Sequence, residues 1–301
     1  MGRRLAPALR HLDGTGTDLS AGALPSLREG LNRRRHEAAV ALDTTGVAIE
    51  EMRAGVVPVR IYRGGSAPAP AVVYCHSGAF VLGNLDIDHR QCVELAERGR
   101  CTVISMDYRL APEHPFPAGL DDAVSVLRWA AENATSLGID ATRFAVAGSS
   151  AGGALAARLA QGVADTPVVF LLLHQPVLDD RPTPSKEEFD ATPGFDSAAV
   201  AAMWRHYLAG EPCSSDAAPG RATELAGLPA TLITCSELDP LRDEAVDYAR
   251  RLMAAGVATE LHVFPGTCHG FDAFVPDWEI SRQLFDLQGA ALRRTFARAA
   301  D

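Results

Sequence analysis

Residues 144–153 read Phe-Ala-Val-Ala-Gly-Ser-Ser-Ala-Gly-Gly, and they are the most informative part of the chain about its fold. Its first part, Phe144–Ala147, is a continuous apolar run, which is typical of a strand buried on both faces. Its second part is built from small residues and begins a helical pattern over Ala151–Val163. A strand that turns sharply into a helix around G-x-S-x-G is the context in which a serine nucleophile is presented. We therefore predict that Ser150 is a nucleophile, and the alternative is a glycine-rich turn without chemistry.

The glycines around Ser150 have a physical reason. On so tight a turn, side chains two residues before and after the nucleophile would collide with neighbouring elements, and Gly148 and Gly152 remove them. The start of the following helix then places free N–H groups and the positive end of the helix dipole beside the serine oxygen. The stretch thus favours chemistry at Ser150 that develops negative charge.

Strand-like and helical patterns alternate along the rest of the chain. The other strand-like runs are Val57–Tyr62, Ala71–Cys75, Cys101–Met106, Val168–Leu173, Ala230–Cys235 and Leu261–Phe264. The other helical patterns are His89–Glu97, Leu120–Glu132, Arg242–Ala255 and Trp278–Ala299. Strands that alternate with helices of this length indicate βαβ units, so we predict an α/β fold around a mostly parallel sheet. The 301 residues then form one sheet-centred domain, although the length alone would allow about two.

Two segments interrupt this alternation. Residues 1–45 are polar and rich in arginine, with leucines at helical spacing, and we expect the run Arg33–Arg35 to be a solvated helix face. Residues 180–218 are rich in proline and glycine around one helical patch, Ser197–Leu208. Long insertions of this kind are often lids or binding loops. We therefore predict an N-terminal helical lid segment, residues 1–45, and a domain of residues 46–301 that carries a lid insertion at about 180–218.

Composition excludes several classes of function. The net charge is -10, which argues against nucleic acid as a partner. The six cysteines show no metal-ligand spacing, so we expect free thiols in a reducing, cytoplasmic compartment and neither a metal nor a cofactor. The N-terminus lacks the apolar core of a signal peptide, and no apolar stretch is long enough to cross a membrane.

An oxyanion-binding loop is predicted directly after the run Ala71–Cys75. The sequence Cys75-His76-Ser77-Gly78-Ala79-Phe80 has small residues that let the backbone approach a substrate carbonyl. The candidate donors are the N–H groups of Gly78, Ala79 and Ala151. The alternative is an ordinary turn in which His76 belongs to the core.

The acid and the base are expected after the last two strands. Asp239 and His269 both follow a strand directly, at the sheet edge where parallel sheets place their sites. The order serine, acid, histidine is that of a hydrolase triad. Glu237 and Asp243 remain rival acids. The other histidines downstream of the serine are His174, His206 and His262, of which His174 and His262 could face the core or the pocket edge.

The chain resembles the hormone-sensitive-lipase family of α/β-hydrolase carboxylesterases, over about residues 55–275. The motifs that carry the resemblance are H-S-G-A-F (76–80), D-Y-R-L-A-P-E (107–113), F-P-A (116–118), G-S-S-A-G-G (148–153), D-P-L-R-D-E (239–244) and H-G-F (269–271). The segments 175–181 and 239–269 are similar to the bacterial heroin-esterase and acetylesterase branch. The resemblance implies an eight-stranded sheet with flanking helices and a helical lid, and a triad of Ser150, Asp239 and His269.

Two departures from the family pattern stand out. Ser77 and Ala79 replace glycines, and their N–H groups keep the expected geometry only if φ is negative at both positions. Ser149 replaces the acid that usually precedes the nucleophile, so Arg109 of the D-Y-R-L-A-P-E motif needs another partner. We expect altered selectivity or stability from these changes rather than lost chemistry.

The expected function is a serine carboxylesterase that hydrolyses short-chain, acetyl-like esters without a cofactor. Residues expected to contact substrate, or else to pack in the core or the lid, are His76, Phe80, Trp204, Tyr207 and Phe271. One alternative is a biosynthetic acyl transfer or elimination on the same triad. Another is a non-catalytic small-molecule receptor, although the receptors of this family have lost the histidine that His269 represents. The resemblance also suggests a homodimer through the strand near Thr259–Phe264.

Overall fold

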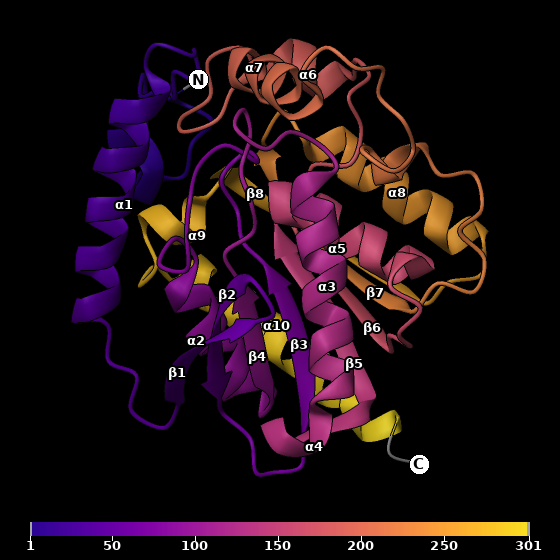
Figure 1. The fold of residues 1–301 in the computed structure, drawn as a ribbon. Coiled ribbons are helices and arrows are strands. Elements are labelled where there is room, and N and C mark those ends of the chain that lie inside the picture. The colour runs from indigo at the N-terminus through magenta and orange to yellow at the C-terminus, as the bar shows by residue number, and fades with distance from the viewer. Residues whose placement is uncertain (1, 300–301) are drawn as a thin grey trace.

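The computed structural model describes residues 2–299, which surround one eight-stranded sheet (Figure 1). The strands are β1 (Ala48–Ala54), β2 (Val57–Arg63), β3 (Ala69–Cys75), β4 (Thr102–Met106), β5 (Ile139–Ser149), β6 (Phe170–His174), β7 (Ala230–Leu238) and β8 (Thr259–Cys268). Their order across the sheet is β1-β2-β4-β3-β5-β6-β7-β8. Only the β1–β2 and β2–β4 pairs are antiparallel within the described residues. The predicted α/β fold and its mostly parallel sheet are confirmed.

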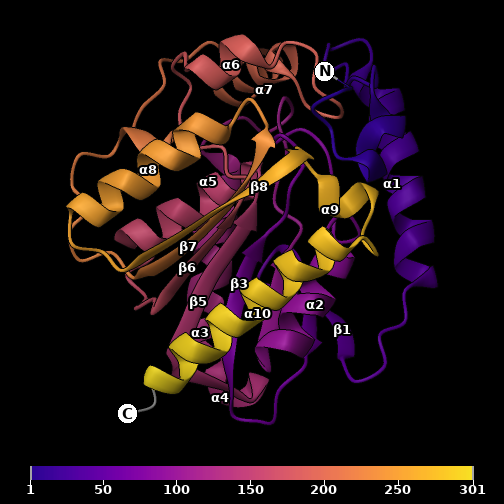
Figure 2. The same ribbon diagram turned by 180° about the vertical axis from the view of Figure 1, so that it is seen from behind.

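Helices cover both faces of the sheet. They are α1 (Leu24–Ala41), α2 (His89–Gly99), α3 (Ala118–Glu132), α4 (Ala134–Leu137), α5 (Ala151–Arg158), α6 (Pro184–Glu188), α7 (Ser197–Leu208), α8 (Arg242–Ala254), α9 (Phe271–Phe274) and α10 (Glu279–Arg298). Figure 1 shows α3 and α5 in front of the sheet, and Figure 2 shows α2 and α10 across its back. A π-helical turn, Leu159–Val163, continues α5.

Alternate side chains of the central strands pack into the two hydrophobic clusters on opposite faces of the sheet. On β3, Val73 and Cys75 pack with α3 and α5, whereas Val72 and Tyr74 pack with α2 and α10. A strand buried on both faces must be apolar at every position, which is why the central strands read as continuous apolar runs. The same rule explains why the sequence analysis missed β1. This edge strand, Ala48–Ala54, pairs on one side only and leaves most side chains exposed, so no apolar pattern marks it.

The two predicted lid segments lie near the carboxyl ends of the parallel strands, where α6 and α7 sit at the top of Figure 1 and α1 runs down one side. They touch each other: His206 Nε2 of α7 donates to Leu19 O at 2.8 Å, and Thr17 Oγ1 donates to Gly194 O. Arg28 of α1 reaches Val81 O at 2.6 Å, close to the predicted oxyanion loop. That these segments open and close as a lid stays a prediction.

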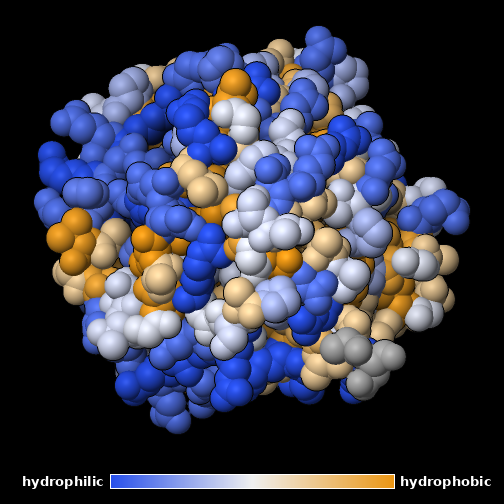
Figure 3. Space-filling model, turned by 60° about the horizontal axis from the view of Figure 1, so that its bottom comes forward, coloured by the Kyte–Doolittle hydropathy of each residue, from blue (hydrophilic) through white to orange (hydrophobic). Residues whose placement is uncertain are grey.

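The surface carries scattered apolar side chains. Figure 3 shows a largely polar face where the amino ends of the parallel strands come forward, with apolar side chains in small groups. No helix within residues 2–299 has the length and hydropathy needed to cross a bilayer. All six cysteines are free thiols, as predicted, and only Cys213 is not fully buried.

Candidate active site

Ser150 sits on a strained turn between β5 and α5. Its backbone has φ 53° and ψ -118°, a conformation that L-residues rarely adopt. A Cβ on Gly148 would lie 2.1 Å from Gly152 O, and a Cβ on Gly152 would lie 2.0 Å from Cys75 O. Only glycine fits at these two positions, so the spacing read from the sequence has the steric cause that was predicted.

Ser150, His269 and Asp239 form one hydrogen-bonded row. Ser150 Oγ lies 2.9 Å from His269 Nε2, and His269 Nδ1 lies 2.8 Å from Asp239 Oδ2. Because a carboxylate only accepts, Nδ1 carries the ring proton and Nε2 accepts from the serine hydroxyl. Asp239 is fully buried, and its other oxygen accepts from Leu241 N at 2.9 Å. In its neutral form, the imidazole of His269 is therefore oriented to take the serine proton.

The rival acids are engaged elsewhere. Glu237 accepts from Gly266 N at 2.7 Å, and Asp243 accepts from Ser185 N at 2.8 Å. Of the other histidines, His262 is exposed on β8 and faces neither the core nor the pocket edge. Asp239 is thus the acid that contacts His269.

A second histidine–carboxylate pair lies beside this row. His174 Nε2 is 3.0 Å from Asp272 Oδ1, and His174 Nδ1 is 2.8 Å from Thr234 Oγ1. Burial raises the pKa of Asp272, but His174 outweighs burial and the net pKa is lowered. Burial likewise lowers the pKa of His269, but the charge and hydrogen bond of Asp239 outweigh it, with help from Asp272, and the net pKa is raised. The site therefore favours a proton on His269 once the serine releases one.

The predicted oxyanion loop approaches Ser150 but departs from the expected backbone. Gly78 and Ala79 line the same cavity as Ser150, and their N–H groups find no acceptor among the described residues. Ala151 N is the first N–H of α5, where no intrahelical acceptor exists. The condition of negative φ fails at Ala79, whose φ is 56°. Gly78 O accepts from both Val81 N and Leu82 N, and this tight turn forces the left-handed conformation.

Asp88 joins two of the three positions at which the sequence departs from the family, Ser77 and Ser149. Its carboxylate accepts from Ser77 N at 2.7 Å and from Ser77 Oγ at 2.8 Å. It also accepts from Tyr74 Oη at 2.9 Å, and Tyr74 Oη lies 2.9 Å from Ser149 Oγ. One carboxylate at the start of α2 thus holds the predicted oxyanion loop and, through Tyr74, the residue before Ser150.

Arg109 pairs with Asp122 instead of with the acid that Ser149 replaces. Its guanidinium and its backbone N–H both bond to Asp122 of α3, with Nη2 to Oδ1 at 2.8 Å and N to Oδ2 at 2.8 Å. The acid replaced by Ser149 is therefore not needed to hold the loop that contains Arg109.

The cavity above Ser150 has a volume of about 220 Å³. Its apolar walls come from Leu19, Leu27, Leu31, Leu82, Ile87, Phe195 and Phe274. None of the aromatic residues predicted to contact substrate lies on these walls. Phe80 stacks on Tyr207 with ring centroids 3.7 Å apart and lies near Trp204, whereas Phe271 packs against Phe264. His76 is buried beneath the loop, where its ring stacks on Tyr108.

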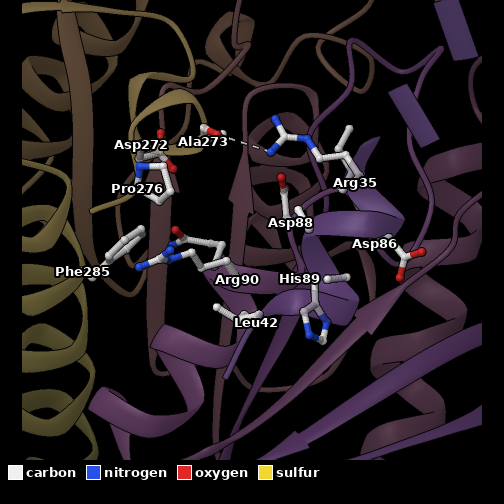
Figure 4. Close-up of a pocket in the computed structure, with 14 residues that line it drawn as sticks. Arg35, Leu42, Asp86, Asp88, His89, Arg90, Asp272, Ala273, Pro276 and Phe285 are labelled. Carbon is white, nitrogen blue, oxygen red and sulfur yellow. Dashed lines mark hydrogen bonds between the residues drawn. The ribbon is translucent and has the colours of Figure 1, made fainter. Parts of the chain in front are cut away.

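A smaller cavity of about 130 Å³ adjoins the first (Figure 4). The two share residues of α1, of the segment before α2 and of α9, namely Arg35, Ile87, Asp88, Asp272 and Ala273. Figure 4 shows the Arg35 guanidinium directed toward Ala273 O, from which Nη1 lies 3.5 Å away. The predicted solvated helix face agrees with the exposure of Arg33 and Arg34, whereas Arg35 is half-buried. Arg34 and Arg35 also line the cavity above Ser150, which the prediction did not include.

Sequence reasoning did not find Gln175, Asp88 or Asp272 as parts of the site. Asp272 lies three residues after His269, and that proximity was a usable signal. Gln175 and Asp88 sit in no spacing pattern, and their partners come from other elements. Within residues 2–299, no group of three or more histidine, cysteine or acidic side chains is arranged to hold a metal ion.

Comparisons with known proteins agree with this geometry. The sequence pattern of the family described as alpha/beta hydrolase fold matches residues 72–273. Esterase LipI of Mycobacterium tuberculosis is 44% identical over 230 residues, 72% of each chain. The crystal structure of esterase LipW from Mycobacterium marinum has a TM-score of 0.95 at 58% identity, covering 98% of this chain and 97% of that one. A bacterial heroin esterase has a TM-score of 0.91 at 35% identity, covering 98% of both chains.

These matches show a shared family as well as a shared fold, because they combine near-complete structural overlap with substantial sequence identity. They agree with the motif resemblance, which rested on separate stretches of the sequence. The chain belongs to the hormone-sensitive-lipase family of α/β-hydrolase carboxylesterases.

Proposed function

We propose that this protein hydrolyses short-chain carboxylic esters through an acyl-enzyme formed on Ser150. The observation that carries the proposal is the row of Ser150 Oγ, His269 and Asp239, with heavy-atom distances of 2.9 and 2.8 Å. These are the distances at which a base and its orienting carboxylate activate a hydroxyl. The relatives named as esterases support the same reaction class.

In the proposed mechanism Ser150 Oγ attacks the ester carbonyl carbon while its proton passes to His269 Nε2. The buried Asp239 carboxylate stabilises the imidazolium that forms. The N–H groups of Gly78, Ala79 and Ala151 donate hydrogen bonds to the oxyanion. Collapse of the intermediate expels the alkoxide, which takes the proton from His269. Water then attacks the acyl-enzyme while His269 takes one of its protons. The second intermediate collapses, the acid leaves, and His269 returns the proton to Ser150 Oγ.

The size of the cavity supports a small substrate. Its volume of about 220 Å³ lies below the roughly 300–1,000 Å³ of pockets that hold drug-sized ligands. The methyl group of Ala79 takes further space where the family pattern has glycine. An acetyl or similarly short acyl group fits these limits better than a long chain.

The test is turnover of p-nitrophenyl esters from acetate to decanoate by the wild type and by Ser150→Ala. We expect the kcat for the acetate to fall about 10⁴-fold or more in the variant. We also expect kcat/KM of the wild type to fall with acyl length. Equal activity of the two proteins contradicts the proposed mechanism, and a preference for the decanoate contradicts the short-chain proposal.

A further inference from the structure

Gln175 lies at the end of β6, between the turn of Ser150 and the loop of His269. Its side chain is 2% exposed, and its backbone has a φ of 47°. A non-glycine residue in this left-handed region is strained, and a fold retains such a residue only where other contacts impose it. The mechanism proposed above assigns no task to this buried, strained glutamine.

The amide of Gln175 bonds to the backbone on both sides of His269. Its Oε1 accepts from Gly270 N at 2.7 Å, and its Nε2 lies 3.3 Å from Cys268 O. Nε2 also donates to Ser236 Oγ at 2.6 Å, and Ser236 Oγ in turn donates to Cys268 O at 3.0 Å. The two neighbours of the histidine are therefore clamped by one side chain and its hydroxyl partner.

The same strand end also holds the nucleophile. Ser150 N donates to the carbonyl of His174, the residue before Gln175, at 2.9 Å. The backbone of Gln175 is fixed in turn, because its N–H donates to Thr234 O of β7 at 2.6 Å. One dipeptide thus contacts the serine turn through a main-chain carbonyl and the histidine loop through an amide.

We infer that Gln175 is a positioning residue, which sets the placement of the His269 imidazole between Ser150 and Asp239. The inference rests on the proposed function, because it concerns the base of that reaction. An amide suits this place. It can donate to one carbonyl and accept from one N–H at the same time, and it adds no charge beside a group whose own charge changes during turnover.

The decisive variant is Gln175→Met, which keeps the side-chain length but loses both the donor and the acceptor. Displacing a reacting group by about 1 Å costs up to about 100-fold in rate, so we expect kcat for p-nitrophenyl acetate to fall about 10- to 100-fold with KM nearly unchanged. The matched control is Gln288→Met, since Gln288 of α10 is equally buried and bonds to Gln91 at 2.6 Å. The control should lose stability but keep its kcat.

The pH profile separates positioning from a general loss of stability. The groups that act on His269 are Asp239, Asp272 with its partner His174, and Glu244 of α8. Burial alone lowers the pKa of His269, and the contact with Asp239 is what raises it. If Gln175→Met loosens that contact, the pKa falls, and the acid limb of kcat/KM moves to lower pH than in the wild type. Gln288→Met should leave the limb in place.

A second variant guards against misfolding of the first. Ser236→Ala removes the hydroxyl that Gln175 bonds to, and we expect a smaller fall in kcat in the same direction. Because both residues act on Cys268 O, the double variant should cost little more than Gln175→Met alone. An active wild type with unchanged kcat and pH limb in both single variants overturns the inference. A wild type without esterase activity contradicts the proposed function instead.

Discussion

The loops on the two sides of Ser150 are held in place by different chemistry. The oxyanion loop after β3 departs from the family motif, contains left-handed backbone at Ala79, and bonds to a carboxylate, Asp88. The His269 loop after β8 matches the motif and bonds to a neutral amide, Gln175. Asp88 follows the loop that it contacts by only 11 residues, whereas Gln175 lies 95 residues before Gly270.

The difference follows from what each loop does in the proposed reaction. The oxyanion loop only has to present fixed N–H groups. The Asp88 carboxylate is stabilised by three hydrogen-bond donors, which are Tyr74 Oη, Ser77 N and Ser77 Oγ. The histidine loop carries a group that gains and loses a proton. A carboxylate beside that group would raise its pKa further, and a neutral amide does not. A carboxylate therefore contacts the backbone of the oxyanion loop at Ser77, whereas an amide contacts the backbone on the two sides of His269, where the carboxylates of Asp239 and Asp272 are already close.

The largest effect is expected on the histidine side, from Asp239→Asn. An amide at this position favours the wrong imidazole tautomer, and such a change costs about 10⁴-fold in kcat in a serine triad. The matched control is Asp243→Asn on the same segment, since Asp243 bonds to Ser185 N rather than to His269. The kcat values of the two variants for p-nitrophenyl acetate decide between the two acids. If kcat falls further in Asp243→Asn than in Asp239→Asn, Asp243 is the acid of the triad.

A smaller effect is expected on the oxyanion side, from Asp88→Asn. The variant loses one acceptor of Ser77 or Tyr74, so the loop loosens while its N–H groups remain. Removing one oxyanion donor outright costs about 10²–10³-fold, and we expect the indirect effect to be about 10-fold in kcat with KM nearly unchanged. Asp86→Asn is the control, because Asp86 pairs with Arg60 at 2.8 Å instead. If Asp88→Asn and the wild type have equal kcat, Asp88 does not hold the oxyanion loop in its working position.

Sequence reasoning predicted that Ser150, Asp239 and His269 lie together, which the structure confirms, and it missed the residues that hold the two loops. The strand–turn–helix around Ser150 and the strand ends before Asp239 and His269 are patterns of local sequence, and α7 begins and ends where its helical patch does. Edge strand β1 carries no apolar pattern, because its side chains face solvent. Gln175 acts through buried hydrogen bonds to residues that are far away in the sequence. No periodicity or spacing in the sequence predicts such contacts, because they form only when the strands assemble.

Sequence left two places open for the candidate pocket aromatics, the substrate pocket and the core or lid, and in the structure they pack in the core. An aromatic residue beside a catalytic motif packs equally well behind the loop as in front of it, and sequence does not distinguish the two. Phe80 has a φ of 60°, and its ring stacks on Tyr207 in the core. The walls of the cavity come instead from leucines of α1 and from Phe195 of the insertion, which the chain brings together only through its tertiary fold.

The smallest effect is expected from Ala79→Gly, which restores the glycine of the family motif. The change relieves about 1 kcal/mol of left-handed strain but removes a buried methyl group worth about 0.8 kcal/mol, so the free energy of unfolding should barely move. The N–H donor is kept, and kcat for the acetate should stay within about twofold. The cavity gains the volume of the methyl group, so kcat/KM for butyrate should rise relative to acetate. Arg100→Gly is the control, because Arg100 has a φ of 51° at the end of α2. Arg100→Gly should raise the free energy of unfolding and leave the ratio of kcat/KM for butyrate to acetate unchanged. If this ratio changes equally in both variants, the methyl group of Ala79 does not set the acyl selectivity.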